Sequence, residues 1–258
     1  MSVVTIPFTD YLQSVTRALD ALEAHRILAQ QDKIIIKPNL VVAKAPPVTT
    51  AVDCVAAIVK YCQEHTRAEI IVAEGAGGTT TDKCYKALGY TRMARELGVK
   101  LVDLDKEPMV NVTSSRAKLY KEFPLPAVLT DGYLISVPCL KDHSICDVTL
   151  SLKNMIGICP AKKFSGFWSF RKSKVHEVDV DQAIVDIVLH RPIDLALIDG
   201  AVGLQGSHLS GQPCRPPKKI IIAGYDPVAV DFVGAEILGW RPENIAHLAL
   251  AKKTFSSQ

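Results

Sequence analysis

The chain has 258 residues, of which 48% are hydrophobic, with a mean hydropathy of +0.17 and a net charge of +3. These values are typical of a soluble globular protein with a substantial core, built as one large domain or a domain with a smaller appendage. No apolar run approaches the ~20 residues that an α-helix needs to cross a bilayer. The N-terminal "MSVVTIPFTDYLQ" has no basic start followed by an apolar stretch, so we expect no secretion signal.

The cysteines indicate a reducing compartment. There are seven, an odd number, and none forms a CxxC pair. The spacing of Cys139, Cys146 and Cys159 matches no zinc or iron–sulfur signature, so buried structural thiols are the favoured interpretation. We expect a cytoplasmic protein.

Helical and extended segments alternate in the first part of the chain. Spaced apolar positions predict an amphipathic helix over 9–30 with Thr9 as its cap. "KIIIK" at 33–37 predicts a buried strand that Pro38 ends, and Thr49 or Thr50 then begins a helix through about residue 64. "EIIVAE" at 69–74 predicts a second strand, and a helix from about 81 to 97 follows it.

The second part of the chain continues this pattern. A strand is expected at 99–104, a loop or edge hairpin at 105–125, and three more strands at 132–138, 194–200 and 218–224. Asp226 followed by Pro227 predicts the start of a helix. Val/Ile runs separated by helices indicate an α/β fold, a mainly parallel sheet with helices on both faces. We expect a single domain over 1–258, from which 105–125 and a lid at 159–180 extend.

Polar and glycine-rich residues follow the predicted strands. "KPNL" follows 33–37, "EGAGG" follows 69–74, "CLKDH" follows 132–138 and "DGAVGLQGSH" follows 194–199. Ligands bind outside the carboxyl ends of strands in open parallel sheets. We therefore expect Lys37, Glu74, Lys141 and Asp199 to lie on one edge of the sheet and to form a shared cleft.

Each candidate has a structural alternative. Lys37 and Asn39 would be a solvated lysine and a turn asparagine if they bind nothing. "EGAGG" would either hold an anion through backbone N–H groups or form a tight turn; it is neither a P-loop nor a GxGxxG motif. His143 and His176 would be ligands or proton carriers, or else structural. Lys153 and Asn154 lie within the apolar run "VTLSLKNMIG", where a buried lysine is costly unless it contacts an anion.

Residues 161–174, "AKKFSGFWSFRKSK", carry five basic residues and no acid. The remaining 25 basic residues are matched by 27 acidic ones, so global charge argues against nucleic-acid binding. The segment itself would bind nucleic acid, touch a membrane surface, or close over an anionic ligand as a mobile lid. We favour the lid, because the segment lies between Lys153 and His176. Its aromatic residues are Phe164, Phe167, Trp168 and Phe170.

Taken together, the motifs resemble the DUF362 family. The resemblance covers residues 30–250 and rests on "IIIKPNLV", "EGAGG", "LISVPCLKDH", "VTLSLKNMIG", the later His176, "LALIDGAVGLQG" and "DPVAVDFVGAEILG". This is an uncharacterised prokaryotic family, some of whose members carry ferredoxin-type iron–sulfur modules. This chain has no CxxCxxC module, so the resemblance does not imply a cluster here. "GLQGSHLSGQP" also departs from the family's more glycine-rich loop, which puts a substrate contact there in doubt.

The leading hypothesis is a binding protein or enzyme for a small anionic molecule. Lys153 and His143 would be its acid–base residues. Asp199 and Asp231 would orient the cations or help to hold a divalent metal. The rival hypotheses are an iron–sulfur electron-transfer protein and a nucleic-acid-binding protein. The expected ligand-binding residues are Lys37, Asn39, Glu74, Gly75, Gly77, Gly78, Lys141, Asn154, His176 and Asp199.

Overall fold

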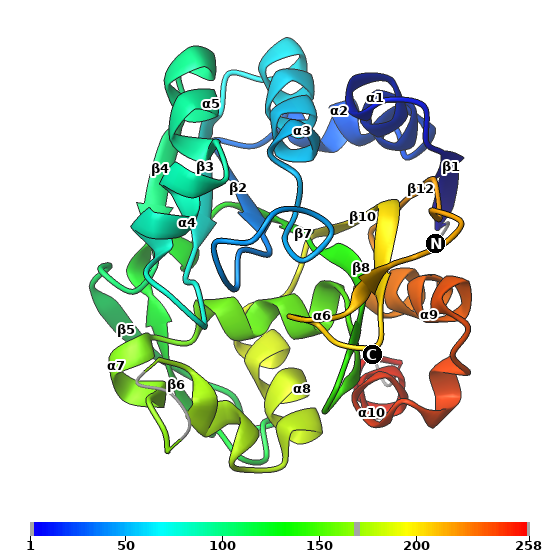
Figure 1. The fold of residues 1–258 in the computed structure, drawn as a ribbon. Coiled ribbons are helices and arrows are strands. Elements are labelled where there is room, and N and C mark those ends of the chain that lie inside the picture. The colour runs from blue at the N-terminus through cyan, green and yellow to red at the C-terminus, as the bar shows by residue number, and fades with distance from the viewer. Residues whose placement is uncertain (1–2, 168–170, 257–258) are drawn as a thin grey trace.

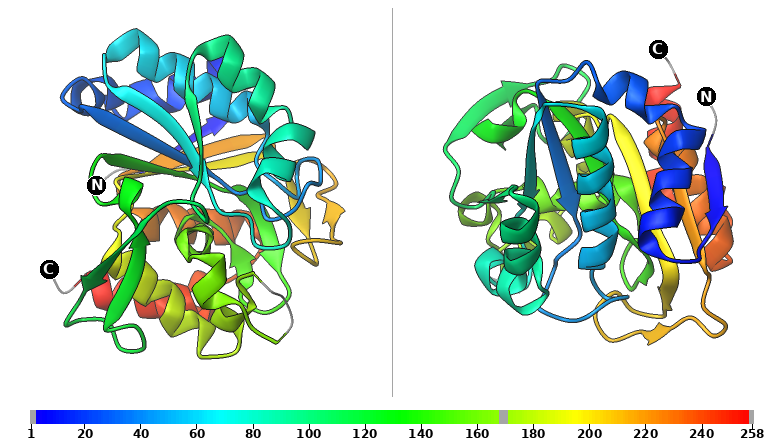
Figure 2. Two further views of the ribbon diagram at one scale, coloured as in Figure 1. Left: turned by 90° about the vertical axis from the view of Figure 1, so that its left-hand side faces the viewer. Right: turned by 90° about the horizontal axis from the view of Figure 1, so that it is seen from above.

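A computed structural model describes residues 3–167 and 171–256, and its centre is one large sheet with helices on both faces (Figures 1 and 2). The sequence prediction of an α/β fold is confirmed. The sheet runs in the order β1 (Val4–Pro7), β12 (Ile220–Gly224), β10 (Leu195–Gln205), β7 (Tyr133–Val137), β2 (Lys33–Pro38), β3 (Glu69–Glu74) and β4 (Lys100–Asp103).

The sheet is mostly parallel, with antiparallel strands toward one edge. β10, β7, β2, β3 and β4 pair in parallel, whereas β12 pairs antiparallel with both β10 and β1. Beyond β7, the strands β8 (Cys139–His143), β9 (Asp147–Thr149) and β11 (Gln212–Pro213) extend the sheet around the far end of β10. All six strands that the sequence predicted therefore belong to one sheet.

Alternation along β2 shows how the sheet is covered. Ile34 and Ile36 belong to one buried cluster and Ile35 to the other, because successive side chains of a strand point to opposite faces. One face packs against α1 (Tyr11–Ala21), α2 (Ala24–Leu28), α3 (Val52–His65), α4 (Thr81–Ala87) and α5 (Tyr90–Leu97) (Figure 2). The other packs against α6 (Ser151–Asn154), α8 (Val180–His190), α9 (Pro227–Leu238) and α10 (Ala246–Phe255).

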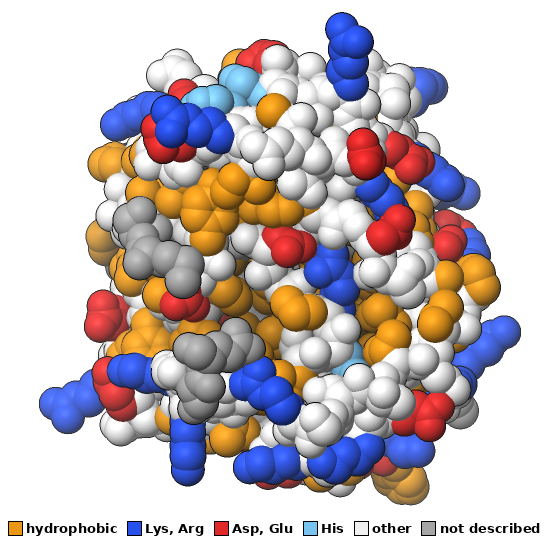
Figure 3. Space-filling model, turned by 180° about the vertical axis from the view of Figure 1, so that it is seen from behind, with side chains coloured by type: hydrophobic (Ala, Val, Ile, Leu, Met, Phe, Trp, Pro, Cys, Tyr) orange, Lys and Arg blue, Asp and Glu red, His pale blue; other side chains and the backbone are white. Residues whose placement is uncertain are grey.

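Smaller elements complete the chain. The expected hairpin at 105–125 is present as β5 (Met109–Thr113) paired with β6 (Glu122–Pro126) in a separate two-stranded sheet. Short helical turns are η1 (Ala127–Leu129), η2 (Met155–Ile158), α7 (Ala161–Phe164), η3 (Ser173–His176) and η4 (Pro242–Asn244). On the face shown in Figure 3, basic side chains lie mainly around the periphery, with acidic side chains among them.

Several helix boundaries differ from those that the sequence predicted. Asp10, not Thr9, caps α1, because its carboxylate accepts the N–H of Gln13. The helical run then breaks at Glu23, which has a φ of 50°. Gly89, with a φ of 85°, divides the predicted 81–97 helix into α4 and α5. Asp226 caps α9 as expected.

The helix that we predicted to begin at Thr49 or Thr50 is α3, which begins at Val52. Neither threonine caps it. Thr50 instead accepts the N–H of Asn39 at 2.9 Å and donates to the carbonyl of Val137 at 2.7 Å. The hydroxyl therefore ties the loop after β2 to the end of β7. This tie helps to fix the loop that carries Asn39.

Candidate functional site

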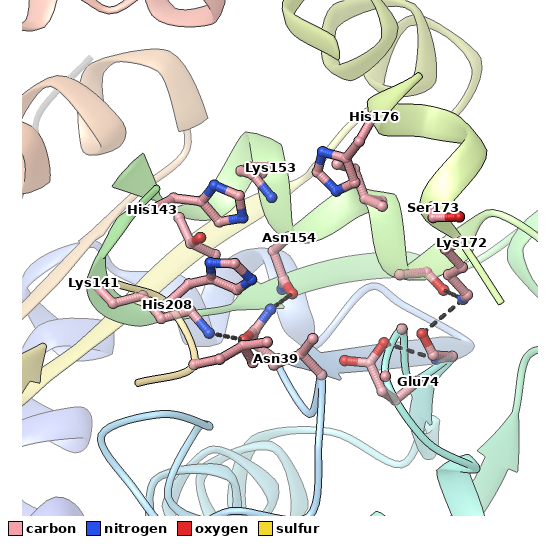
Figure 4. Close-up of a pocket in the computed structure, with 18 of the residues that line it drawn as sticks. Asn39, Glu74, Lys141, His143, Lys153, Asn154, Lys172, Ser173, His176 and His208 are labelled. Carbon is pink, nitrogen blue, oxygen red and sulfur yellow. Dashed lines mark hydrogen bonds between the residues drawn. The ribbon is translucent and has the colours of Figure 1, made fainter. Parts of the chain in front are cut away.

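A pocket of about 330 Å³ lies where β2, β3, β8 and α6 meet (Figure 4). It brings together all of the expected binding and acid–base residues except Asp199. It also includes Lys172 and His208, which the sequence did not single out. The ionisable and amide side chains that line it are Lys37, Asn39, Glu74, Lys141, His143, Lys153, Asn154, Lys172, His176 and His208.

Two of the expected strand ends lie elsewhere than predicted. Pro138 separates β7 from β8, so Lys141 and His143 lie within a strand of their own and not in a loop after the predicted 132–138 strand. β10 continues to Gln205, so Asp199 lies inside a strand and not at its end. Lys37 and Glu74 do lie at the ends of β2 and β3, which are parallel neighbours.

Lys37 and Glu74 form a buried ion pair at the base of the pocket. The Lys37 Nζ lies 3.0 Å and 3.1 Å from the two carboxylate oxygens of Glu74, and both side chains are almost fully buried. Burial lowers the pKa of Lys37, while Glu74 opposes that shift. Because each charge is matched by the other, this pair leaves no net charge for a ligand.

A chain of amide contacts extends from this pair. The Oδ1 of Asn154 accepts from the Lys37 Nζ and from the Asn39 Nδ2, each at 3.1 Å. The Oδ1 of Asn39 then accepts from the Lys141 Nζ at 2.7 Å, which also donates to the carbonyl of Val48 at 2.7 Å. Lys141 therefore contacts neutral oxygens, and burial lowers its pKa. Among the described residues, no carboxylate pairs with it.

Lys153 is the least satisfied cation of the pocket. Its side chain projects between His143 and His176 (Figure 4), and only 7% of the residue is exposed. Over residues 3–167 and 171–256, its Nζ has no hydrogen bond or ion pair. Burial lowers its pKa to about 8, and Lys141 contributes to the shift. Asp231, which we expected to orient the cations, forms no ion pair with Lys153 in this part of the chain.

Three histidines form a stack beside Lys153. The ring of His143 lies 3.8 Å from that of His208 and 5.8 Å from that of His176, measured between centroids. Burial and the neighbouring lysines lower the pKa of all three histidines, to about 4 for His176 and about 3 for His208. They are therefore neutral at physiological pH.

Backbone contacts define the tautomer of His143. Its Nδ1 accepts the N–H groups of Ile145 at 3.1 Å and Cys146 at 3.2 Å. The ring hydrogen is consequently on Nε2, which makes His143 a hydrogen-bond donor toward the pocket. This geometry suits a neutral donor better than the proton carrier that we expected from the sequence.

Two backbone donors of the glycine loop, for which an anion cradle and a tight turn were the alternatives, are used within the protein. The N–H of Gly75 donates to Glu74 Oε1 at 2.7 Å, and that of Gly78 donates to the carbonyl of Val41 at 2.8 Å. A Cβ at Gly75 would lie 2.3 Å from the Nζ of Lys172. The loop thus allows close approach of a lysine, and these two backbone donors are already used.

Lys172 joins three loops at the edge of the pocket. Its Nζ donates to the carbonyls of Gly75 and Gly157, each at 2.6 Å, and lies 3.4 Å from Asp105. Arg171 also contacts Asp105 and donates to the carbonyl of Ala76. These basic residues face inward, although the sequence suggested a run of unpartnered charges.

The aromatic residues of 161–174 are not equivalent. Phe164 is buried against Tyr120 and Phe123, with ring centroids 5.5 Å and 5.8 Å away, whereas Phe167 is 89% exposed. Trp168 and Phe170 lie outside the described residues. Phe164 is therefore part of the core, and mobility of the proposed lid remains a prediction.

Asp199 and Asp231 serve backbone groups outside the pocket. Asp199 accepts from the N–H groups of Ala51 and Ala201 and from the hydroxyl of Tyr11, each at 3.2 Å. Asp231 accepts from Ser151 and Leu152, and burial raises its pKa to about 7. We therefore assign both carboxylates to structure.

The donor set does not fit a metal ion. Throughout the described part of the chain, no three His, Cys, Asp or Glu residues are placed to hold one. Glu74, the carboxylate of the pocket, is already bound by Lys37. All seven cysteines are free and buried.

Sequence could indicate Lys37, Lys141 and Lys153 but not the two additional residues. Lys172 lies in a basic segment whose local spacing gives no sign of burial. His208 follows the glycine-rich "GLQG", and its position after β10 was the available signal. No helix within the described ranges is long and apolar enough to cross a membrane.

Comparison with known proteins agrees with the motifs. A family model described as a domain of unknown function, DUF362, matches residues 34–236. The chain is also 24% identical over 228 residues to the thylakoid-associated protein sll1697 of Synechocystis sp., a match that covers 86% of this chain and 68% of that protein. The match to the family model extends over most of the sheet and every lysine of the pocket. This chain therefore belongs to the DUF362 family.

Proposed function

We propose that the protein binds a small anionic molecule in the pocket, and that Lys141 and Lys153 are its principal contacts. The supporting observation is a charge imbalance. Lys37 is paired with Glu74, and Lys172 lies near Asp105. Within the described residues, Lys141 and Lys153 have no carboxylate at ion-pairing distance.

The imbalance favours a ligand with about two negative charges. An ammonium group that is removed from water without a counter-charge is strongly destabilising. An anion between Lys141 and Lys153 would offset that cost. The Nε2–H of His143 would donate to a further oxygen of the anion. A phosphate group or a dicarboxylate has this charge and enough acceptors.

The pocket also suits catalysis, because it removes its amines from bulk water. Among those amines, Lys153 is the one whose protonation state would decide whether it acts as an acid or as a base. A cytoplasmic location remains part of the proposal, supported by the free cysteines. The name of the Synechocystis relative places that protein at the thylakoid and is no guide to the ligand.

Calorimetric titration and thermal melting with inorganic phosphate, malonate and an uncharged sugar test the proposal. We expect the two anions to bind and to raise the melting temperature. A ligand at 100 times its Kd adds about 2.7 kcal/mol to the free energy of unfolding. Lys153→Met and Lys141→Met should each abolish the effect.

Lys60→Met is the matched control, because Lys60 is exposed on α3. This substitution also removes one positive charge, but outside the pocket. The variant should bind the anions as the wild type does. Equal loss of binding in all three variants would mean that only the net charge matters. That outcome, or no response to either anion, would contradict the proposal.

A further inference from the structure

We propose that Lys153 is a nucleophile that forms an imine with the carbonyl group of the bound anion. The ligand would then be a small aldehyde or ketone that carries a carboxylate or phosphate group. This inference rests on the proposed function, because the anionic group brings the carbonyl carbon to the amine. It goes further in that it names the reacting atom and the substrate class.

Lys153 differs from the other lysines of the pocket in its hydrogen bonding. The amines of Lys37, Lys141 and Lys172 all donate hydrogen bonds to carbonyl, amide or carboxylate oxygens. Among described residues, no such acceptor holds the Nζ of Lys153, although only 7% of the residue is exposed. An amine that no acceptor holds has its lone pair available as soon as it loses a proton.

The surroundings also favour the neutral amine. The ionisable groups around it are Lys141, His143, Cys146, His176, Asp181 and His208. Asp181 favours the protonated amine, but burial and Lys141 outweigh it, the three histidines are neutral, and burial raises the pKa of the Cys146 thiol to about 11. With the pKa of Lys153 at about 8, roughly half of this amine is neutral at pH 8. A desolvated lysine near another cation is a recurrent way to activate this nucleophile.

The chemistry needs no additional reactant. The Nζ lone pair forms a bond to the carbonyl carbon, and the carbonyl π pair moves to oxygen, which takes up a proton as the nitrogen loses one. The resulting carbinolamine loses its hydroxyl group and its remaining N–H proton together as water, which leaves an imine that solvent protonates. Amine and carbonyl thus give imine and water without a change in oxidation state. Because the backbone contacts leave the ring hydrogen on Nε2, the Nε2–H of His143 would stabilise the oxygen as charge develops on it.

Reductive trapping tests this step. The intact protein is incubated with glycolaldehyde phosphate or glyoxylate and with cyanoborohydride, and the modified residues are found by peptide mass mapping. These probes carry a phosphate and a carboxylate respectively, so the probe that labels the protein faster identifies the preferred anionic group. We expect one adduct per chain, at Lys153, formed at least about tenfold faster than at the exposed Lys60 at pH 8.

Matched probes and variants give the test its controls. Uncharged glycolaldehyde should label Lys153 at least about tenfold more slowly than its phosphate ester, because it lacks the anchoring group. Lys153→Arg keeps a positive charge but has no nucleophilic amine, so the adduct should be lost while phosphate still raises the melting temperature. Lys153→Met should lose both, and a native melting transition shows that each variant is folded.

The outcomes separate this inference from the proposed function. Adducts spread over exposed lysines, in a protein that phosphate still stabilises, would overturn the nucleophile and leave anion binding intact. Undiminished labelling of Lys153→Arg would do the same. A protein that phosphate and malonate do not stabilise would overturn the proposed function, and with it the requirement for an anionic carbonyl compound.

Discussion

Asp231 on α9 accepts the backbone N–H of Ser151 at 2.8 Å, and its second oxygen accepts that of Leu152 at 2.9 Å. One carboxylate therefore satisfies two donors at the start of α6, the short helix that carries Lys153 and Asn154. We expected Asp231 to orient the cations or to help hold a divalent metal, and it acts on the backbone of the short helix that carries the lysine that we propose to react. A four-residue helix has little stability of its own, so this contact matters for the site.

The first prediction concerns the titration of Asp231. Its folded-state pKa of about 7 lies above the ordinary value of 3.8, so the folded protein binds a proton that the unfolded chain has already released. This group's contribution to stability is fully present below about 3.8 and is lost as the pH rises through about 7. Asp231→Asn should remove that slope from melting curves recorded between pH 5 and pH 8. An unchanged slope would show that Asp231 is ionised throughout.

The second prediction concerns Lys153 and has the opposite sign. A lysine whose pKa falls from 10.5 to about 8 destabilises the folded state while it is protonated, and stability recovers as the pH rises from about 8 to 10.5. Lys153→Met should therefore raise the melting temperature at pH 7, and the gain should disappear near pH 10.5. Melting curves of both proteins at the two pH values provide the measurement. A lower melting temperature for the variant at pH 7 would mean that the amine has an unrecognised stabilising partner.

The third prediction tests the buried pair of Lys37 and Glu74. Glu74→Gln leaves an unmatched ammonium in the core and should cost about 3–5 kcal/mol in the free energy of unfolding. Adding Lys37→Met should recover much of that loss, since replacing both charges of a buried pair is often close to neutral. Denaturant titration of the single and double variants measures the coupling.

Glu96→Gln is the control for this pair, because Arg92 and Glu96 form an exposed contact of 3.7 Å on α5. Its loss should leave stability nearly unchanged. Similar effects for the two substitutions would imply that the Lys37–Glu74 pair is hydrated.

The fourth prediction concerns Gly157. A Cβ at this position would lie 2.4 Å from both the Lys37 Nζ and the Glu74 Oε1, too close for the pair to keep its geometry. Gly157→Ala should weaken anion binding and lower stability. Gly77→Ala is the matched control within the same pocket, because its Cβ would meet only a Val41 methyl group at 3.7 Å. Titration with phosphate should distinguish the two alanine variants, and equal affinities would contradict the steric argument.

The fifth prediction addresses the segment that we expected to be a lid. Lys172→Met removes the donor to the carbonyls of Gly75 and Gly157, so amide hydrogen exchange should accelerate over 161–167 and 173–176. Lys174→Met removes a charge from an exposed neighbour and should have little effect. If both variants exchange as the wild type does, the apolar contacts of Phe164 hold this segment without the lysine.

The fold could be predicted from the sequence because its signals are local. Runs such as "KIIIK" and "EIIVAE" mark buried strands, and their parallel pairing places Lys37 beside Glu74. The break at Pro138, the continuation of β10 past Asp199 and the division at Gly89 each depend on tertiary packing or on one backbone dihedral angle.

The site was less predictable because its partners are distant in the sequence. Lys141 and Asn39 are 102 residues apart, and Lys172 contacts a carbonyl 97 residues earlier. Composition indicated that 161–174 is basic but not which of its charges point inward. Likewise, only the contacts of Ile145 and Cys146 reveal that His143 is a donor.

The position of Gly157 against the buried pair also restricts how this pocket can change during evolution. Any side chain at Gly157 displaces Lys37 or Glu74, and the loss of one charge leaves the other unmatched. If these three positions are replaced one at a time, the first replacement therefore gives a destabilised protein, whereas a joint replacement does not. Among relatives, positions 37, 74 and 157 should covary as a group, and a lineage that has lost the pair is where a larger residue at 157 is expected.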